Sequence, residues 1–286
     1  MKLSDYQAKA SRTVQRPGQE LPDLAVHLLG LVGETGSIAS EYKKLLRDGP
    51  AHLTAKSRLR EELGDVLWYL ATLATKLDLD LDDIATANLT KVTDRWRTSA
   101  TADLFDEDCP TTEQLPRHAR FTFATDRDQQ TVTTRLLLEG EQVGNTLTDA
   151  SHVDDGYRFH DVFHLAHAAL LGWSPVLRKL LGRKRRSKPL IDVAEDGGRA
   201  IVAEEGVAHM VFAYAASHDY LRDIQRVDTV LLDLIRSSVG QLEVSVRRSA
   251  DWEQAILAGY TAWNYLRDHD GGSVLIDLLD RKIIAE

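Results

Sequence analysis

The chain has 286 residues, 43% of them hydrophobic, which is enough material for two globular units with cores of their own. Its 35 basic and 44 acidic residues give a formal net charge of −9, which argues against general nucleic-acid binding because an acidic surface repels phosphates. The single cysteine, Cys109, excludes an intrachain disulfide and fits a reducing cytoplasm. No signal-peptide pattern opens the sequence, and no apolar run approaches the roughly 20 residues of a membrane helix.

Four helices are predicted in the first third of the chain, from the spacing of apolar residues and from the breaks between them. The pairs Pro17-Gly18 and Gly49-Pro50 mark the first two breaks. The predicted helices cover residues 1–16, 24–46, 57–77 and 81–96. Helices of this length with short connections are expected to form an antiparallel four-helix bundle.

Carboxylates recur at helical spacing on the second and third of these helices. Glu34 and Glu41 share one face of the second helix, while Glu62 and Asp65 share one face of the third. If the two helices pack antiparallel, the acidic faces can meet across the seam and hold a divalent cation. The alternative is that these residues form solvated helix faces, as charged residues at such spacing usually do.

Residues suited to phosphate binding follow on the fourth helix. Asn88, Lys91 and Arg95 are three or four residues apart and offer an amide and two cations on one face, as a polyphosphate clamp requires. Two further residues carry alternative interpretations. Lys44 either contacts phosphate or extends into solvent, and Trp68 either stacks on a nucleotide base or belongs to the core.

The motifs GLVGETGS, EELGDVLWYL and NLTKVTDR, in this order, resemble the MazG-type all-α nucleotide pyrophosphohydrolases, whose pattern is E-x-x-E, E-x-x-D and N-x-x-K. The resemblance covers about residues 1–97. It implies that Glu34, Glu62 and Asp65 bind Mg²⁺, with Mn²⁺ as the alternative ion, and that Asn88 and Lys91 face the phosphates. It also implies hydrolysis of a nucleoside triphosphate to the monophosphate and pyrophosphate, by a homo-oligomer that is a dimer or a tetramer.

One position departs from the family pattern, because Ser37 stands where the second glutamate of E-x-x-E is expected. A serine hydroxyl is neutral and short, so it replaces a carboxylate neither as a strong magnesium ligand nor as a general base. Glu41, one turn further along the helix, and Glu61, beside the third-helix pair, are the candidates to compensate. If neither does, the protein is a nucleotide-binding sensor or regulator with weakened catalysis.

The middle of the chain changes character. Residues 99–117 are polar, contain two prolines and are interpreted as a linker. Residues 120–147 are rich in β-branched and aromatic residues around turn-like segments, which predicts an antiparallel meander of two or three strands. Such a small sheet is marginal alone, so we expect it to pack on a helical partner.

The C-terminal part is predicted to be helical. The expected helices cover residues 157–171, 175–181, 198–217, 228–237, a segment that starts at about 241 or 252 and ends at 266, and 272–285. Between them the run RKLLGRKRRSKP, residues 178–189, forms a positive patch on an acidic protein. It is interpreted as a solvated loop, since basic runs without interleaved aromatic residues seldom recognise nucleic acid.

A second constellation of ligand-type residues lies in this part. His160 and His164 are one helical turn apart, next to Asp161 and His167, and a later helix carries acidic residues. Such an arrangement either holds a transition metal, giving a second metal-dependent activity, or caps helices and fills packing seams. The residues to test first are Arg158, His160, His164, Glu204 and Glu205.

Taken together, these patterns predict a mostly α protein in three parts. Residues 1–98 are expected to be a MazG-like four-helix bundle, 99–149 a linker with a β-meander, and 150–286 a helical C-terminal domain. The expected partners are a nucleoside triphosphate and further copies of the chain.

Overall fold

The computed structural model describes residues 1–15, 18–99, 104–128 and 131–286. Helices dominate these residues, so the predicted mostly α fold class is confirmed. The expected end of the first helix, part of the expected linker and one turn of the meander fall on 16–17, 100–103 and 129–130, outside the described residues. The chain divides into two compact units, Met1–Thr93 and Asp94–Glu286. Within the described part, no helix has the length and apolar character needed to cross a membrane.

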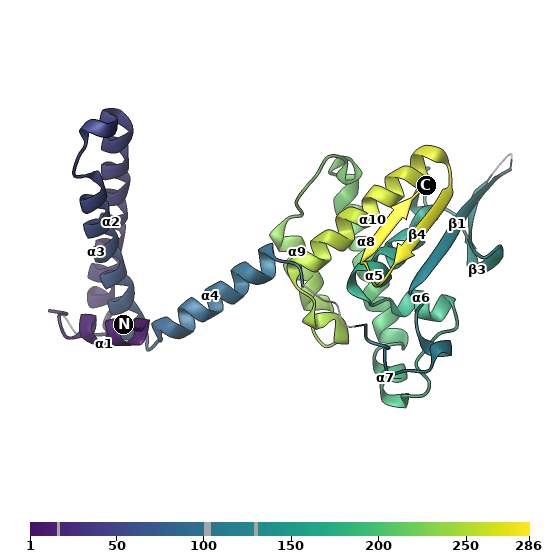
Figure 1. Ribbon diagram of the computed structural model, residues 1–286, viewed down its shortest axis with the longest axis horizontal. Coiled ribbons are helices and arrows are strands. Elements are labelled where there is room, and N and C mark those ends of the chain that lie inside the picture. The colour runs from purple at the N-terminus through teal and green to yellow at the C-terminus, as the bar shows by residue number, and fades with distance from the viewer. Residues whose placement is uncertain (16–17, 100–103, 129–130) are drawn as a thin grey trace. The chain divides into compact units, whose positions relative to one another are not determined.

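The N-terminal unit is built on a long helical hairpin. Helices α2 (Leu21–Asp48) and α3 (Ala55–Lys76) lie side by side, joined by a short 3₁₀ turn at Gly49–Ala51 (Figure 1). Gly30 permits their close approach, because a Cβ built on this residue would lie 2.3 Å from the Tyr69 ring. Helix α1 (Leu3–Ser11) packs against α3. The expected antiparallel pairing of the second and third helices is therefore present.

The fourth helix, α4 (Leu81–Trp96), does not complete the expected bundle. Its start is held by α1, since Gln7 Oε1 accepts a hydrogen bond of 2.9 Å from the Leu81 backbone N–H. Leu81 is the one buried residue described in this helix, and Leu89 is 66% exposed. A helical apolar pattern identifies a face that needs a partner, and it does not say whether the same chain supplies that partner.

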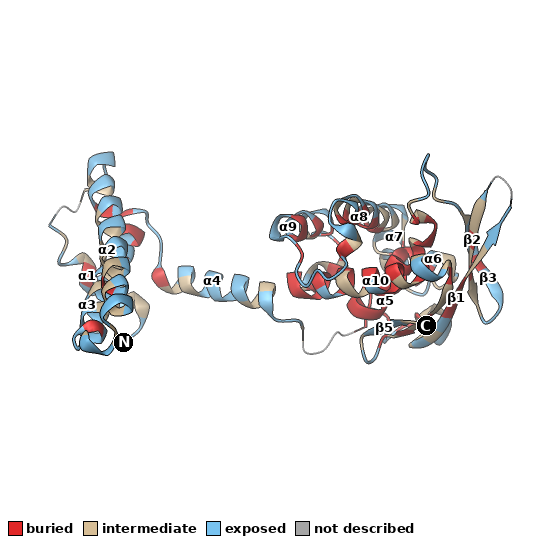
Figure 2. Ribbon diagram, turned by 90° about the horizontal axis from the view of Figure 1, so that it is seen from above, coloured by how far each residue is buried: buried red, intermediate tan, exposed pale blue. Residues whose placement is uncertain are grey.

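The core of the N-terminal unit is correspondingly small (Figure 2). Ala10, Ala71, Ala74 and Leu81 form it, with Leu3, Tyr6 and Trp68 packed around. Many apolar side chains of α2 and α3 are exposed; they include Leu29, Val32, Leu46 and Leu63.

The C-terminal unit contains a five-stranded antiparallel sheet of order β3-β2-β1-β4-β5. Its strands are β1 (His118–Arg127), β2 (Val132–Leu138), β3 (Glu141–Leu147), β4 (Gly272–Asp277) and β5 (Lys282–Ala285). The first three strands are the predicted meander. The expected helix over 272–285 is wrong, because this segment forms β4 and β5. Asp277 Oδ1 accepts the backbone N–H groups of Leu279 and Asp280, which makes the turn between these strands.

In the described part of this unit, six α-helices accompany the sheet, and two of them, α5 and α10, lie against its β4 and β5 strands (Figure 1). All eleven residues of α5 are buried, so this helix runs through the centre of the unit (Figure 2). A helix so enclosed must satisfy its polar side chains internally. The six helices are α5 (Asp161–Leu171), α6 (Pro175–Leu180), α7 (Pro189–Ala194), α8 (Gly198–Ala216), α9 (Thr229–Ser238) and α10 (Ser249–His269).

The division of the chain also differs from the expected three parts. The meander and the C-terminal helices belong to one unit, because β4 pairs with β1 at Phe121↔Val274 and joins the chain's last strands to the meander. Sequence patterns place strands along the chain but do not reveal which distant strand pairs with which. The pairing of β1 and β4 is a tertiary contact.

The basic run is not the solvated loop that its composition suggested. The Arg178 side chain is buried, and its Nη2 donates to Asp106 Oδ2 at 2.7 Å. Arg185 is likewise buried and donates at 2.7 Å to both Asp196 and Glu243. These arginines connect segments distant in sequence inside the C-terminal unit.

Candidate metal and nucleotide site

Three carboxylates from α2 and α3 meet at one place in the N-terminal unit. Glu34, Glu62 and Asp65 each offer an oxygen, and these oxygens all lie within 4.8 Å of one another. Burial, followed by the charges of Asp65 and Glu62, raises the pKa of the Glu34 carboxyl above its usual value. Like charges held this close repel one another, and a divalent cation between them would relieve the repulsion.

The surroundings of these carboxylates are open. Gly33 and Gly36 flank Glu34, and Gly64 lies between Glu62 and Asp65. A Cβ built on any of the three glycines would meet no other atom within 4 Å. Asp65 itself is exposed, while Glu34 and Glu62 are partly buried. An open, oxygen-only group of three carboxylates fits a hard cation that retains water and binds phosphate oxygens.

Glu41 lies outside this group, although sequence spacing made it a candidate fourth ligand or base. Its carboxylate accepts a hydrogen bond of 3.0 Å from His52 Nε2 and is paired with Lys44. Hydrogen bonds from Lys44 and then His52 lower the pKa of Glu41. Lys44, a candidate phosphate contact, is therefore engaged within α2. Glu61, the other candidate to compensate for Ser37, pairs with Arg58 at 3.3 Å.

Trp68 has a packing role in this structure. Its indole Nε1–H donates to Thr13 Oγ1 at 2.8 Å, and its ring stacks on His27 with centroids 5.9 Å apart. Trp68 also packs against the small core of this unit. Of the two interpretations of Trp68, the structure favours the core over stacking on a base.

The three candidate phosphate-binding residues of α4 have different surroundings. Asn88 and Lys91 are exposed. Arg95 belongs to the C-terminal unit, where it forms an ion pair of 3.1 Å with Glu253 and donates to the Val227 carbonyl. Arg95 is therefore paired within the second unit, since the unit boundary crosses α4 between Thr93 and Asp94. Spacing on one helix cannot reveal such a boundary.

The second constellation is brought together around α5 in the C-terminal unit. Glu204 Oε1, on α8, accepts hydrogen bonds from His164 Nδ1 at 2.9 Å and from His167 Nδ1 at 3.0 Å. Ser174, which sequence reasoning missed, donates to the same oxygen at 2.8 Å. Its signal was local, because a serine before Pro175 is a typical N-cap and Ser174 does cap α6. Arg158 pairs with Asp149, Asp154 and Asp270 instead of joining the histidines.

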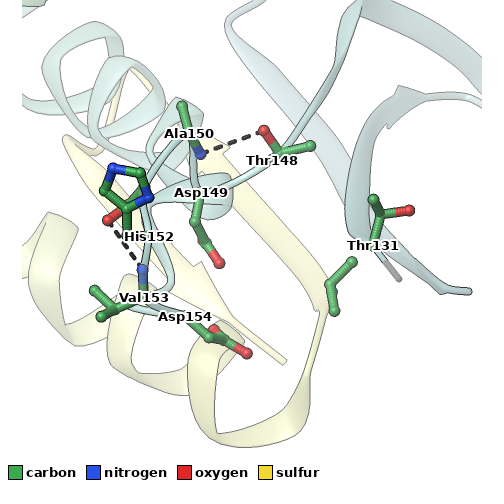
Figure 3. Close-up of a pocket in the computed structure, with 9 residues that line it drawn as sticks. Thr131, Thr148, Asp149, Ala150, His152, Val153 and Asp154 are labelled. Atoms are coloured by element: carbon green, nitrogen blue, oxygen red, sulfur yellow. Dashed lines mark hydrogen bonds between the residues drawn. The ribbon is translucent and has the colours of Figure 1, made fainter. Parts of the chain in front are cut away.

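An open hollow near the meander carries no comparable chemistry. Figure 3 shows its lining by Thr131 and by residues from Thr148 to Asp154. The two carboxylates among them, those of Asp149 and Asp154, pair with Arg158 at 2.9 and 2.6 Å. These acids are therefore engaged in holding the loop.

Three carboxylates that converge on a helical hairpin fit a site for a divalent cation. Residues 25–98 match the sequence model of the MazG nucleotide pyrophosphohydrolase domain, and residues 100–286 match that of the MazG C-terminal domain. The chain therefore belongs to the MazG family, and the resemblance inferred from its first third is confirmed. Members of this family generally depend on a divalent metal.

The name of one curated relative states no function. The chain is similar to the "Gene 37 protein" of Mycobacterium phage L5, with 42% identity over 101 residues. The similarity covers 33% of this chain and 89% of the phage protein. No solved structure matches the chain.

Proposed function

We propose that this protein hydrolyses nucleoside triphosphates to the monophosphate and pyrophosphate, with Mg²⁺ or Mn²⁺ held by Glu34, Glu62 and Asp65. The observation that carries the proposal is the convergence of these three carboxylates, within 4.8 Å, from two helices that the family pattern singles out. Family membership indicates the pyrophosphohydrolase class, and the acidic group supplies the matching ligand chemistry.

In the proposed reaction a water oxygen forms a bond to the α-phosphorus. The bond between that phosphorus and the α,β-bridging oxygen breaks, and pyrophosphate leaves with the electron pair. The water proton passes to a carboxylate of the acidic group, because Ser37 is not a base and Glu41 is held by Lys44 and His52. When bound, the cation polarises the phosphoryl oxygens and lowers the pKa of the attacking water.

A homo-oligomer, dimer or tetramer, is part of the proposal. Apolar side chains line α2, α3 and α4 with little to cover them in one chain; Leu29 is 71% and Leu89 66% exposed. Patches of this kind mark interaction surfaces. Because Asn88 and Lys91 share α4 with Leu89, we propose that assembly brings this helix against the acidic group of a neighbouring copy. There the amide and the ammonium group would neutralise phosphate charge.

The second candidate function is a nucleotide sensor with weakened catalysis, and Ser37 is the observation that favours it. The two carboxylates considered as substitutes, Glu41 and Glu61, both form other ion pairs, which supports this candidate. Such a site would bind a nucleotide with its metal and turn it over slowly.

The test is a panel of all NTPs and dNTPs with the full-length protein, in Mg²⁺ and separately in Mn²⁺. The assay measures monophosphate and pyrophosphate, and calorimetry measures binding. Release of both products, lost in Asp65→Asn, supports the enzyme. Tight binding without turnover, with turnover gained in Ser37→Glu, supports the sensor. Neither binding nor turnover by the folded protein would overturn both proposals.

A further inference from the structure

The central helix of the C-terminal unit carries three ligand-type side chains where apolar ones would be expected. Asp161, His164 and His167 lie on α5, whose eleven residues are all buried. Burying a polar group is costly unless its hydrogen bonds are made, so each of these side chains needs a specific partner. Those partners show which atoms are occupied and which remain open.

Glu204 occupies the inner side of this cluster. In addition to the hydrogen bonds from the two histidine Nδ1 atoms, its carboxylate accepts a hydrogen bond from Ser174 Oγ and one of 2.9 Å from the backbone N–H of Val176. It is fully buried and its oxygens are fully used. A carboxylate that receives His Nδ1–H fixes the ring orientation and leaves Nε2 as the atom that binds a metal. Glu204 is therefore a positioning residue and not an open ligand, which revises the expected group of His160, His164, Glu204 and Glu205.

The second ring nitrogen of His164, Nε2, has no comparable hydrogen bond among the described residues. The ring that carries this nitrogen is fully buried. Glu205 Oε2 lies 3.5 Å from this nitrogen. The unpartnered Nε2, beside the Glu205 carboxylate, is therefore the ring atom of His164 that is placed to bind a cation.

His160 is arranged in the same way one turn earlier. Its Nδ1–H donates to the Tyr157 carbonyl at 2.9 Å, and its ring lies parallel to the Tyr157 ring at 4.6 Å. This leaves Nε2, which is 3.6 Å from Asp161 Oδ1.

The spacing of these atoms suits one ion. His160, Asp161 and His164 each offer a ligand atom, and these atoms lie within 4.8 Å of one another. Two atoms bound to the same tetrahedral zinc at about 2.0–2.1 Å are about 3.4 Å apart, close to the 3.5 and 3.6 Å separations found here. The Glu205 side chain is 42% exposed, which gives an ion a way in from solvent.

We propose that His160 Nε2, His164 Nε2 and the Asp161 carboxylate, with Glu205 as fourth ligand, bind a divalent transition metal, zinc first. The ligand set separates this site from the acidic group of α2 and α3. Imidazole nitrogen favours zinc and its neighbours, whereas a site of carboxylate oxygens alone favours magnesium or manganese. The site is independent of the proposed pyrophosphohydrolase activity, because all its residues lie in the C-terminal unit.

The experiment uses the full-length Asp65→Asn protein, whose N-terminal metal site is disabled, after removal of metals with a chelator. It is titrated with Co²⁺, whose visible absorption intensifies when nitrogen ligands hold it in four- or five-coordinate geometry. Zn²⁺ is then added as competitor, and metal content is measured after dialysis. We expect a saturable visible band at one ion per chain, abolished by Zn²⁺.

The variants assign the ligands. His160→Ala and Glu205→Gln should each weaken Co²⁺ binding by about tenfold or more, and Glu204→Gln by about 10–100-fold through the orientation of His164. His218→Ala is the matched control, because this exposed histidine of the same unit also bonds a backbone carbonyl through Nδ1 and should change nothing. Glu205 is partly exposed, so its variant remains informative if His160→Ala does not fold.

Two results would overturn the proposal. One is the absence of a Co²⁺ band in Asp65→Asn protein whose circular dichroism is native. The other is a band of unchanged affinity in both His160→Ala and Glu205→Gln, which would place the ion elsewhere. Pyrophosphate release, measured on protein with Asp65 intact, is a separate readout.

Discussion

The two clusters of metal-ligand side chains differ in what supports them. Glu34, Glu62 and Asp65 converge across one helical hairpin in a unit with a small core and exposed apolar faces. His160 and His164 lie in a unit with an extensive core, and hydrogen bonds from Nδ1 fix the orientation of each ring. Under the proposals made above, the first site is completed by a neighbouring copy, whereas the second is organised by its own chain. Five predictions test this contrast.

The largest effect is expected from a buried ion pair of the C-terminal unit. Arg185→Ala removes the cation paired with Glu243 and the nearer of the two cations paired with Asp196, and loss of one partner of a buried pair costs about 3–5 kcal/mol of unfolding free energy. The matched change in the N-terminal unit, Arg58→Ala, removes an exposed pair and should cost less than about 1 kcal/mol. Urea unfolding measures both. Equal losses would show that burial does not distinguish the units.

Asp65→Asn tests the acidic group. It keeps the shape of the side chain and removes a charge, so pyrophosphate release should fall by about 10²–10³-fold, the usual cost of losing one stabilising group. Because Asp65 is exposed, the circular dichroism spectrum and the unfolding midpoint should stay close to those of the parent protein. A variant with full turnover would remove the carboxylates from the mechanism.

Asp251 gives the C-terminal unit a dependence on pH. Burial opposes its charge, but hydrogen bonds from Arg281 and Ser99 outweigh it and lower its pKa. A lowered pKa in the folded state stabilises the fold above the ordinary Asp pKa of about 3.9, and this stabilisation is lost as pH falls through the folded value. Asp251→Asn should cost about 1.5–3 kcal/mol at neutral pH. Its deficit should shrink in acid, as urea unfolding across pH would show; a constant deficit would contradict the assignment.

Leu29→Lys tests whether a second copy covers the N-terminal unit. A charge on this exposed leucine of α2 should weaken self-association by about tenfold, or about 1.4 kcal/mol. Light scattering across protein concentrations measures the change. Leu190→Lys is the control, because Leu190 is 86% exposed in the other unit. A parent protein that stays monomeric at every concentration would contradict assembly.

The smallest effect is expected at Trp68. Trp68→Phe keeps the ring and removes the hydrogen bond to Thr13, at a cost of about 0.5–1.5 kcal/mol in stability. Because this ring packs against α1 and His27, the KM for nucleotide should hardly change. A large rise in KM without loss of stability would restore the stacking interpretation.

Particular residues show how far the sequence could be interpreted alone. Helical spacing located α2, α3 and α4 to within a few residues, and it put Glu62 and Asp65 on one face. The same reasoning failed for β4 and β5, because a short apolar run with β-branched residues fits a helix or a strand equally well. It also failed for Arg185, since composition shows a charge but not the acids that surround it.

The sequence by itself determined the family, the mostly α class and the residue types at both clusters, because these depend on local spacing and on motif order. The tertiary structure decided the rest. It placed a unit boundary between Lys91 and Arg95. It also paired Glu41 with Lys44 and His52, and it brought Glu204 into a hydrogen bond with His164. Each of these outcomes depends on a partner distant in the chain or on packing, and no local pattern encodes which partner a side chain meets.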